Sequence, residues 1–189
     1  KLPRKWDAFL REDHNKQEQS SNQIIVTYGH QVLSSPPVDT TCLSPCTHEE
    51  ADTRMILHTA NAIQQGHNKI LLRTVDTNVV VLAVTLVPKL PVHAKPEVWI
   101  AFGTGKHLRF IAAHEISRSL GPQTSMALPF FHVFTGCDNV SCFSSRGKKT
   151  AFQTWKAFPQ VTTAFLALAC KLFKISYPIR PNVPMLEGE

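Results

Sequence analysis

Three short acidic motifs contain the residues of this sequence whose types and spacing are suited to chemistry. Glu50 and Asp52 fall where a helix is expected to begin, and Asp76 and Asn78 follow a short apolar run. Asp138 lies further on, in a Gly-Cys-Asp-Asn segment. Carboxylates gathered at one place repel one another and are costly to desolvate unless a cation neutralises them. Because hard divalent cations prefer oxygen ligands and assist phosphodiester hydrolysis, the motifs together predict a metal-dependent site.

The elements that would hold these motifs follow from the hydrophobic pattern. Residues 49–65 place apolar side chains at helical spacing, with acidic residues at the start, where the helix dipole favours them. Residues 69–74 predict a strand that ends just before Asp76, and residues 98–102 predict a second strand. A helix, a strand and then the buried apolar run at 79–87 are typical of an α/β fold. Since ligands of α/β sheets gather at the carboxyl ends of strands, Asp76 is expected at a functional edge.

The remaining pattern predicts further elements and boundaries. These are a helix at 6–19, a hairpin at 24–33, a strand and then a helix at 110–120, and helices at 150–158 and 161–173 separated by Pro159. We expect residues 1–45 to be an N-terminal helix, hairpin and loop, and a truncated start of the domain because the chain opens with Lys1 rather than Met. Residues 46–175 would form the core, and residues 176–189 an extended tail.

Composition and charge limit the class of protein. The 189 residues are 43% hydrophobic and 18% charged, which fits one globular domain rather than a disordered chain. A formal net charge of +6 and a pI near 9.2 favour an anionic partner, most often nucleic acid. The alternative is a basic surface without a special partner.

Apolar runs and cysteines limit the cellular setting. The longest apolar run falls far short of the roughly 20 residues that span a membrane, so we expect no membrane partner. The five cysteines are an odd, sparse set for a chain of this length. They predict reduced thiols and an intracellular location, nuclear or cytoplasmic.

The acidic motifs occur in the order found in a known family. The sequence resembles the 5′-nuclease and flap-endonuclease branch of the PIN-like nucleases. In its bacterial members Glu-Ala-Asp-Asp begins a helix, a strand ends in Asp-x-Asp, and a segment starting Asp-Asn-Ile-Pro-Gly follows. The matching segments here are Glu-Ala-Asp-Thr at 50–53, Asp-Thr-Asn at 76–78, Asp-Asn-Val at 138–140 and Gly-Lys-Lys-Thr-Ala at 147–151. In outline, the resemblance spans residues 49–158.

The resemblance implies a fold, a cofactor and a partner. The fold would be PIN-like, with a central, mainly parallel sheet flanked by helices and a helix-two-turn-helix-like element at 136–158. One or two Mg²⁺ or Mn²⁺ ions would be bound by Glu50, Asp52, Asp76, Asn78 and Asp138, of which the four carboxylates would be catalytic. The residues expected to contact the phosphates of DNA or RNA are Arg146, Lys148 and Lys149. The implied activity is structure-directed, metal-dependent hydrolysis of phosphodiester bonds.

Two departures from the family pattern leave other functions open. Asn78 replaces the second Asp of Asp-x-Asp, which removes a negative charge but keeps a neutral oxygen. No Asp of this chain corresponds to the carboxylate on the first core strand of the family. A catalytically weakened or inactive nucleic-acid-binding module on the same fold is therefore the alternative, and a protein-interaction domain is a third.

Other motifs favour structural interpretations. The two cysteines and the histidine within residues 42–48 lack the second ligand pair that structural zinc requires. The Gly-Thr-Gly-Lys-His run at 103–107 lacks the leading Gly and the Ser or Thr of a phosphate loop, so it is interpreted as a strand–turn–strand or as a basic loop near a phosphate. The histidines, His114 and His132 among them, match no pattern with a nucleophile, and most are expected to be structural or exposed.

Overall fold

The computed structural model describes residues 23–35, 37–44, 50–91, 95–137 and 147–172. The helix expected at 6–19, the tail at 176–189, and the candidate residues Asp138 and Arg146 lie outside them. The strands are β1 (Ile24–Tyr28), β2 (Gln31–Ser35), β3 (Lys69–Thr74), β4 (Glu97–Phe102) and β5 (Arg109–Ala112). The helices are α2 (Ala51–Gln64), α3 (Thr77–Leu86), α4 (Ala113–Leu120), α5 (Pro122–Phe134), α6 (Lys148–Ala157) and α7 (Val161–Leu172), with 3-10 turns η1 (Val87–Lys89) and η3 (Gly105–His107).

A three-stranded mixed sheet in the order β3-β4-β5 forms the β part of this α/β fold. β3 pairs in parallel with β4, so that Lys69 faces Glu97 at one end and Thr74 faces Phe102 at the other. β5 runs antiparallel to β4 because the connection between them is too short for a crossover. The predicted α/β class is confirmed, but the sheet is mixed rather than mainly parallel, since one of its two strand pairings is antiparallel.

The turn between β4 and β5 requires glycine at its first position. Gly103 has a φ of +90°, and a Cβ at this residue would lie 2.8 Å from the carbonyl oxygen of His107. Any other residue would therefore have a strained backbone at this position, and its Cβ would clash with that oxygen. Residues 103–107 connect two paired strands, so the predicted strand–turn–strand is confirmed.

The main core is formed by α2, α3 and the sheet. Its buried members are Ile56, Ala60, Ile63, Leu72, Val79, Ala83, Val84, Leu86, Leu90, Val98, Ile100 and Ala113. α3 packs against α2, α4 and α5 at once. A helix covered on several sides must be apolar around most of its circumference, which explains the uninterrupted apolar run of the sequence there.

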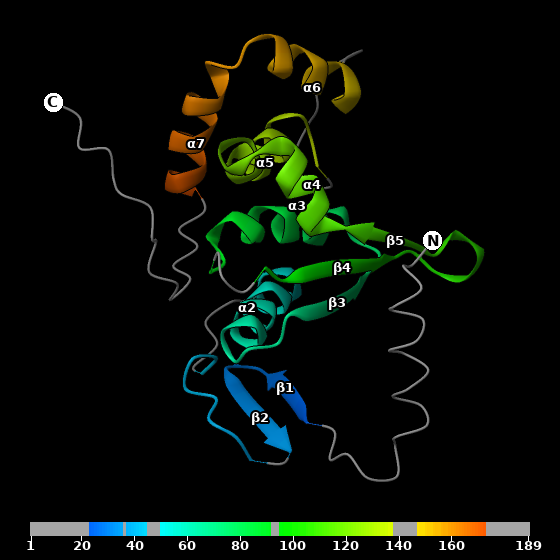
Figure 1. Ribbon diagram of the computed structural model, residues 1–189, viewed down its shortest axis with the longest axis vertical. Coiled ribbons are helices and arrows are strands. Elements are labelled where there is room, and N and C mark those ends of the chain that lie inside the picture. The colour runs from blue at the N-terminus through cyan, green and yellow to red at the C-terminus, as the bar shows by residue number, and fades with distance from the viewer. Residues whose placement is uncertain (1–22, 36, 45–49, 92–94, 138–146, 173–189) are drawn as a thin grey trace, which may run out of the picture.

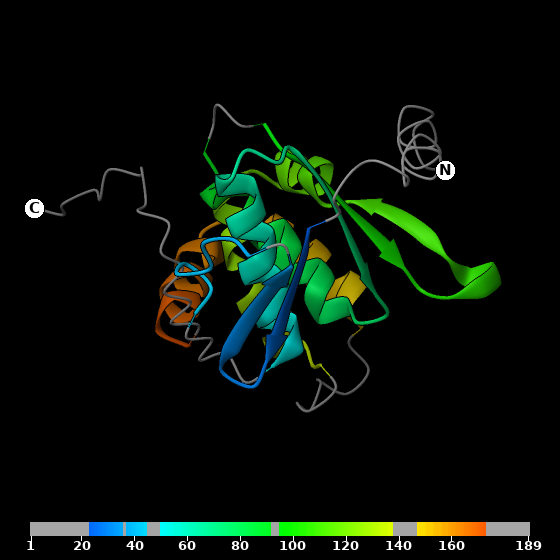
Figure 2. The same cartoon turned by 90° about the horizontal axis from the view of Figure 1, so that it is seen from below.

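The β1–β2 hairpin packs on α2 at one end of the molecule. Ile25 and Val32 of the hairpin contact the buried side chains of Leu43 and Leu57. Figure 1 shows the hairpin at the bottom, then α2 and the sheet, then α3 and α4, with α5, α6 and α7 above, and Figure 2 shows the hairpin in front of α2. The predicted hairpin is confirmed.

α3 and α5 lie side by side and antiparallel. At the start of α3, Asn78 Oδ1 is 3.0 Å from His132 Nε2 near the end of α5. At the end of α3, Thr85 Oγ1 is 3.0 Å from the carbonyl oxygen of Ser125 near the start of α5. Pro129 has no N–H, so this carbonyl lacks its ordinary helical donor four residues on. The Thr85 hydroxyl is a donor within reach of this carbonyl, although its one hydrogen is shared with the carbonyl oxygen of Val81 in the same helix, at 2.8 Å.

The C-terminal helices α6 and α7 pack on α5 through aromatic rings. Phe131 of α5 stacks on Trp155 of α6 with 4.9 Å between ring centroids, and Phe165 of α7 lies 5.3 Å from the same Trp155 ring. Trp155 Nε1 donates a hydrogen bond to Thr162 Oγ1 at 3.0 Å. The two helices expected on either side of Pro159 are confirmed. No helix in the described parts of the chain is long and apolar enough to cross a membrane.

Candidate functional site

The acidic residues of the first two motifs meet where α2 and α3 begin. Asp76 follows the carboxyl end of β3 and is the N-cap of α3, while Glu50 is the N-cap of α2 and Asp52 lies in its first turn. α2 packs against α3, and Asp76 and Asn78 at the start of α3 both act on Asp52 in the first turn of α2, so the two helix starts are neighbours. Both helices direct the positive ends of their dipoles toward this region, which favours negative charge there. The structure thus brings together the carboxylates that are far apart in the sequence.

Asp76 has a structural task in addition to its charge. Its Oδ1 accepts a hydrogen bond from the backbone N–H of Asn78 at 2.7 Å and so caps α3. Its own backbone N–H donates to Thr74 Oγ1 at 3.0 Å, which fixes the passage from β3 into the helix. Glu50, in contrast, makes no side-chain capping bond and is exposed. The local fold therefore holds the Asp76 carboxylate firmly and leaves that of Glu50 to solvent.

The electrostatics of the cluster are seen at Asp52. Burial raises the pKa of this carboxyl above its usual value, and the negative charges of Asp76 and Glu50 raise it further. A hydrogen bond from the Asn78 side chain lowers the pKa of Asp52 and offsets part of this effect. A carboxylate whose neighbours are like charges gains most when a cation joins the group.

Asn78 links the acidic cluster to α5. Because the Asp52 carboxylate accepts, the Asn78 amide nitrogen is the donor between them. The Asn78 amide oxygen lies 3.0 Å from His132 Nε2, which must carry the hydrogen since the oxygen can only accept. The amide is therefore held in one orientation from both sides. An amide oxygen has two acceptor sites, and His132 uses one of them.

Sequence reasoning missed His132. It lies 54 residues from its partner Asn78 and in the apolar second half of α5. No local motif marks it, because only the packing of α5 on α3 brings the two side chains together. The expectation of a structural or exposed histidine overlooked its position next to the cluster.

The donor chemistry of the cluster suits a hard divalent cation, since its side chains offer carboxylate and amide oxygens. Among the described residues, however, no group of three or more His, Cys, Asp or Glu side chains is arranged to bind a metal ion. Glu50, Asp52 and Asp76 influence one another electrostatically without forming a closed set of ligands. Asp138, the fourth predicted carboxylate, is outside the described residues.

The two lysines predicted to contact nucleic acid differ in the structure. The Lys148 ammonium donates to the carbonyl oxygens of His132 and Gly136 and to Thr135 Oγ1, all at the end of α5. A cation at this position complements the negative end of the helix dipole. Lys149 is exposed at the start of α6. Of the two lysines, only Lys148 is tied to the end of α5 by these contacts.

Comparisons with known proteins add no family. No family model, no curated protein and no solved structure matches the chain. The resemblance to the PIN-like nucleases therefore rests on the sequence motifs, and arguments about function rest on the geometry of the described residues.

Proposed function

We propose that the protein is a divalent-metal-dependent nuclease that hydrolyses phosphodiester bonds of DNA or RNA, directed by structure rather than sequence. The observation that carries the proposal is the placement of Glu50, Asp52 and Asp76 at the starts of α2 and α3, just after β3. Burial and then the charges of Asp76 and Glu50 raise the pKa of Asp52, which supports the same interpretation. A cation bound among these side chains would relieve the repulsion that Asp52 experiences, and the carboxyl end of a strand is where ligands of α/β sheets gather. A PIN-like arrangement of the fold is part of this proposal.

Each described residue has a distinct task in the proposed site. Asp52 and Asp76 would bind Mg²⁺ or Mn²⁺, with Glu50 and the sequence-predicted Asp138 completing the acidic set. When bound, the cation supplies neutralising charge for the phosphate and promotes attack by water. Asn78 orients Asp52 through its amide, and the Asp76 carboxylate is fixed by its bond to the start of α3. Lys149, with the sequence-predicted Arg146, would contact the phosphate backbone.

The test is cleavage of labelled flap, single-stranded and duplex substrates, as DNA and as RNA, with Mg²⁺ or Mn²⁺ and with chelator. Asp52→Asn, Asp76→Asn and Asp138→Ala are compared with Glu115→Gln, which removes an exposed carboxylate from α4. We expect metal-dependent cutting that the first three variants lose and Glu115→Gln retains. Equal cutting by all four variants would contradict the proposal.

The second candidate is a nucleic-acid-binding module on the same fold with weakened or lost catalysis. Asn78 favours it, because its amide is engaged by Asp52 and His132 where the family has a further carboxylate. Asn78→Asp restores that charge and distinguishes the two functions. Cutting gained by Asn78→Asp in an otherwise inactive protein indicates the module, whereas cutting by the wild type indicates the enzyme.

A further inference from the structure

A second site lies at the opposite end of α3 from the acidic cluster. A pocket of about 570 Å³ opens there, within the range of small-molecule sites. It is lined by Val87, Pro88, Leu90, Pro91, Lys95, Pro96, His114, Ser117, Arg118, Gly121 and Pro122. Since α3 has 10 residues, the helix separates pocket and cluster by about 15 Å.

The charges of the pocket are all of one sign. Lys95 and Arg118 line it, and none of the described lining residues is acidic. Neither cation forms an ion pair with another described residue. α5 begins at this pocket, with Gly121 as its N-cap and Pro122 in its first turn, so the positive end of the α5 dipole adds to the field. The site is therefore electrically suited to an anion.

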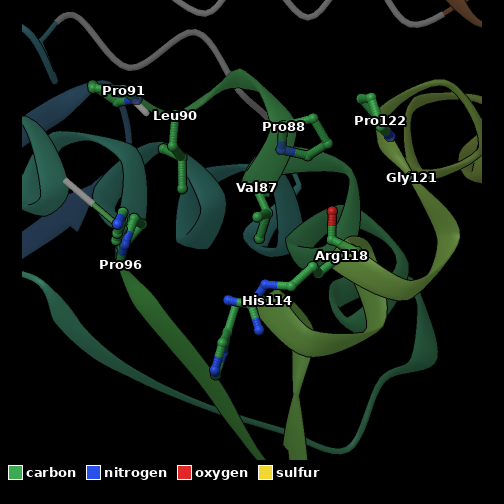
Figure 3. A pocket seen from close by; sticks show the side chains of 11 residues that line it. Val87, Pro88, Leu90, Pro91, Pro96, His114, Arg118, Gly121 and Pro122 are labelled. Atoms are coloured by element: carbon green, nitrogen blue, oxygen red, sulfur yellow. The ribbon is translucent and has the colours of Figure 1, made fainter. Parts of the chain in front are cut away.

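His114 provides a directed hydrogen-bonding group in the pocket wall. The side chain is only 7% exposed, and its Nδ1 lies 3.0 Å from the carbonyl oxygen of Val98. Because a carbonyl can only accept, Nδ1 carries the hydrogen, and in the neutral ring Nε2 is left as an acceptor for an N–H or O–H group of a ligand. The Trp99 ring meets the imidazole edge-on at 5.4 Å and fixes its plane. Figure 3 shows His114 and Arg118 together on one side, with Pro91 and Pro96 across from them.

The other walls are apolar and stiff. Four prolines line the pocket, and a proline ring locks its own φ. Lys95 has a φ of +37°, a left-handed conformation that non-glycine residues rarely adopt and that gathers at functional sites. A wall that does not have to be ordered on binding loses little conformational entropy when a ligand enters.

We infer that this pocket binds a small organic anion, with a carboxylate or a monoester phosphate held by Arg118 and Lys95. The apolar body of the ligand lies against Val87, Leu90 and the prolines, and His114 Nε2 contacts a polar group of the ligand. The inference is independent of the proposed nuclease activity, because the pocket shares none of its lining residues with the acidic cluster.

The experiment titrates the protein with phenyl phosphate, benzoate and the neutral benzyl alcohol, followed by calorimetry and by NMR of the His114 ring protons. The variant Arg118→Gln is matched with Arg73→Gln, which removes an exposed arginine of β3. We expect saturable binding of an anionic probe, no comparable binding of benzyl alcohol, and a His114 shift that saturates with the ligand. Arg118→Gln should weaken binding at least about tenfold and Arg73→Gln by less than about twofold.

The two anions distinguish the ligand class, since binding of phenyl phosphate alone indicates a phosphate site and binding of both a general anion site. No saturable binding of either anion, equal binding of benzyl alcohol, or equal weakening by both arginine variants would overturn the inference. Arg118→Lys keeps the charge and should bind more tightly than Arg118→Gln. This comparison keeps the test decisive if the glutamine variant is less stable.

Discussion

The two ends of the antiparallel pair α3 and α5 present opposite chemistry. At one end α2 and α3 begin, and the side chains are the carboxylates of Glu50, Asp52 and Asp76. At the other end α3 stops and α5 begins, and the charged side chains are those of Lys95 and Arg118. Each end has at least one helix N-terminus, so helix polarity alone does not decide the sign of the side chains.

The two ends also differ in the surroundings of their charged side chains. At the acidic end, burial and then the like charges of Asp76 and Glu50 raise the pKa of Asp52. The cations at the pocket end, Lys95 and Arg118, are set around an apolar hollow. The acidic end is thus built to gain from a compact cation, and the pocket end to accept a bulkier anion. The formal net charge of +6 does not show that acidic and basic side chains are gathered at opposite ends.

The largest expected effect is a loss of cleavage when only the acidic end is changed. Asp76→Asn should lower cleavage by about 100-fold or more while keeping α3 capped, because Asn is a good N-cap but lacks the charge. Asp76→Ala should lose cleavage and about 1 kcal/mol of stability as well. Cleavage rates and urea denaturation of the two variants separate charge from capping. Unchanged binding of phenyl phosphate in Asp76→Asn would show that the ends are independent, and a changed affinity would show that they are not.

The next largest effect is a loss of stability when the contact between α3 and α5 is weakened. Thr85→Val removes the hydroxyl whose one hydrogen is shared between the Ser125 carbonyl at 3.0 Å and the Val81 carbonyl at 2.8 Å, and we expect a loss of about 1 kcal/mol in the free energy of unfolding. Pro129→Ala returns a backbone N–H to that carbonyl. Thr85→Val should therefore cost less in a Pro129→Ala background, as a double-mutant cycle by chemical denaturation would measure. Equal costs in both backgrounds would contradict this account.

A smaller effect distinguishes the two lysines near the acidic end. Lys148→Met should cost about 1 kcal/mol, because the ammonium donates to groups at the end of α5. Lys149→Met should leave stability within about 0.5 kcal/mol and reduce the salt dependence of nucleic-acid binding by about one phosphate contact. Thermal melting and binding titrations at several salt concentrations provide the two readings. A loss of stability in Lys149→Met and a loss of salt dependence in Lys148→Met would contradict this assignment of the two lysines.

The smallest effect concerns the pH dependence of stability at Asp52. Because its pKa is raised in the folded state, the folded protein binds this proton more tightly than the unfolded chain does. Its contribution to stability is fully present below the ordinary aspartate pKa of 3.8 and is lost as the pH rises through the folded pKa. Asp52→Asn should therefore be slightly more stable than wild type at pH 7 in chelator, by well under about 1 kcal/mol since the side chain is only partly buried. Denaturation curves from pH 3 to 7 test this, and added Mg²⁺ should favour the wild type.

Local patterns in the sequence predicted most of the elements, and they failed where distant segments meet. The helix at 49–65, the strand at 69–74 and the turn at 103–107 are encoded by nearby residues and occur as expected. The antiparallel pairing of β5 was not anticipated, although the short turn before it requires that direction. His132 and the basic pocket could not be predicted, because only the packing of α3, α4 and α5 brings their residues together.

The hydrogen bond between Thr85 and Ser125 has a consequence for how the sequence can evolve. Pro129 removes a donor that the helix would otherwise contain, and a hydroxyl on another helix, 44 positions earlier, compensates for part of it, since its hydrogen is shared with Val81. Selection would therefore act on positions 85 and 129 as a pair: a proline at 129 should be accompanied by serine or threonine at 85, and loss of one should relax the constraint on the other. A library that randomises both positions, sorted for folded protein, should recover this correlation without any knowledge of what the protein binds.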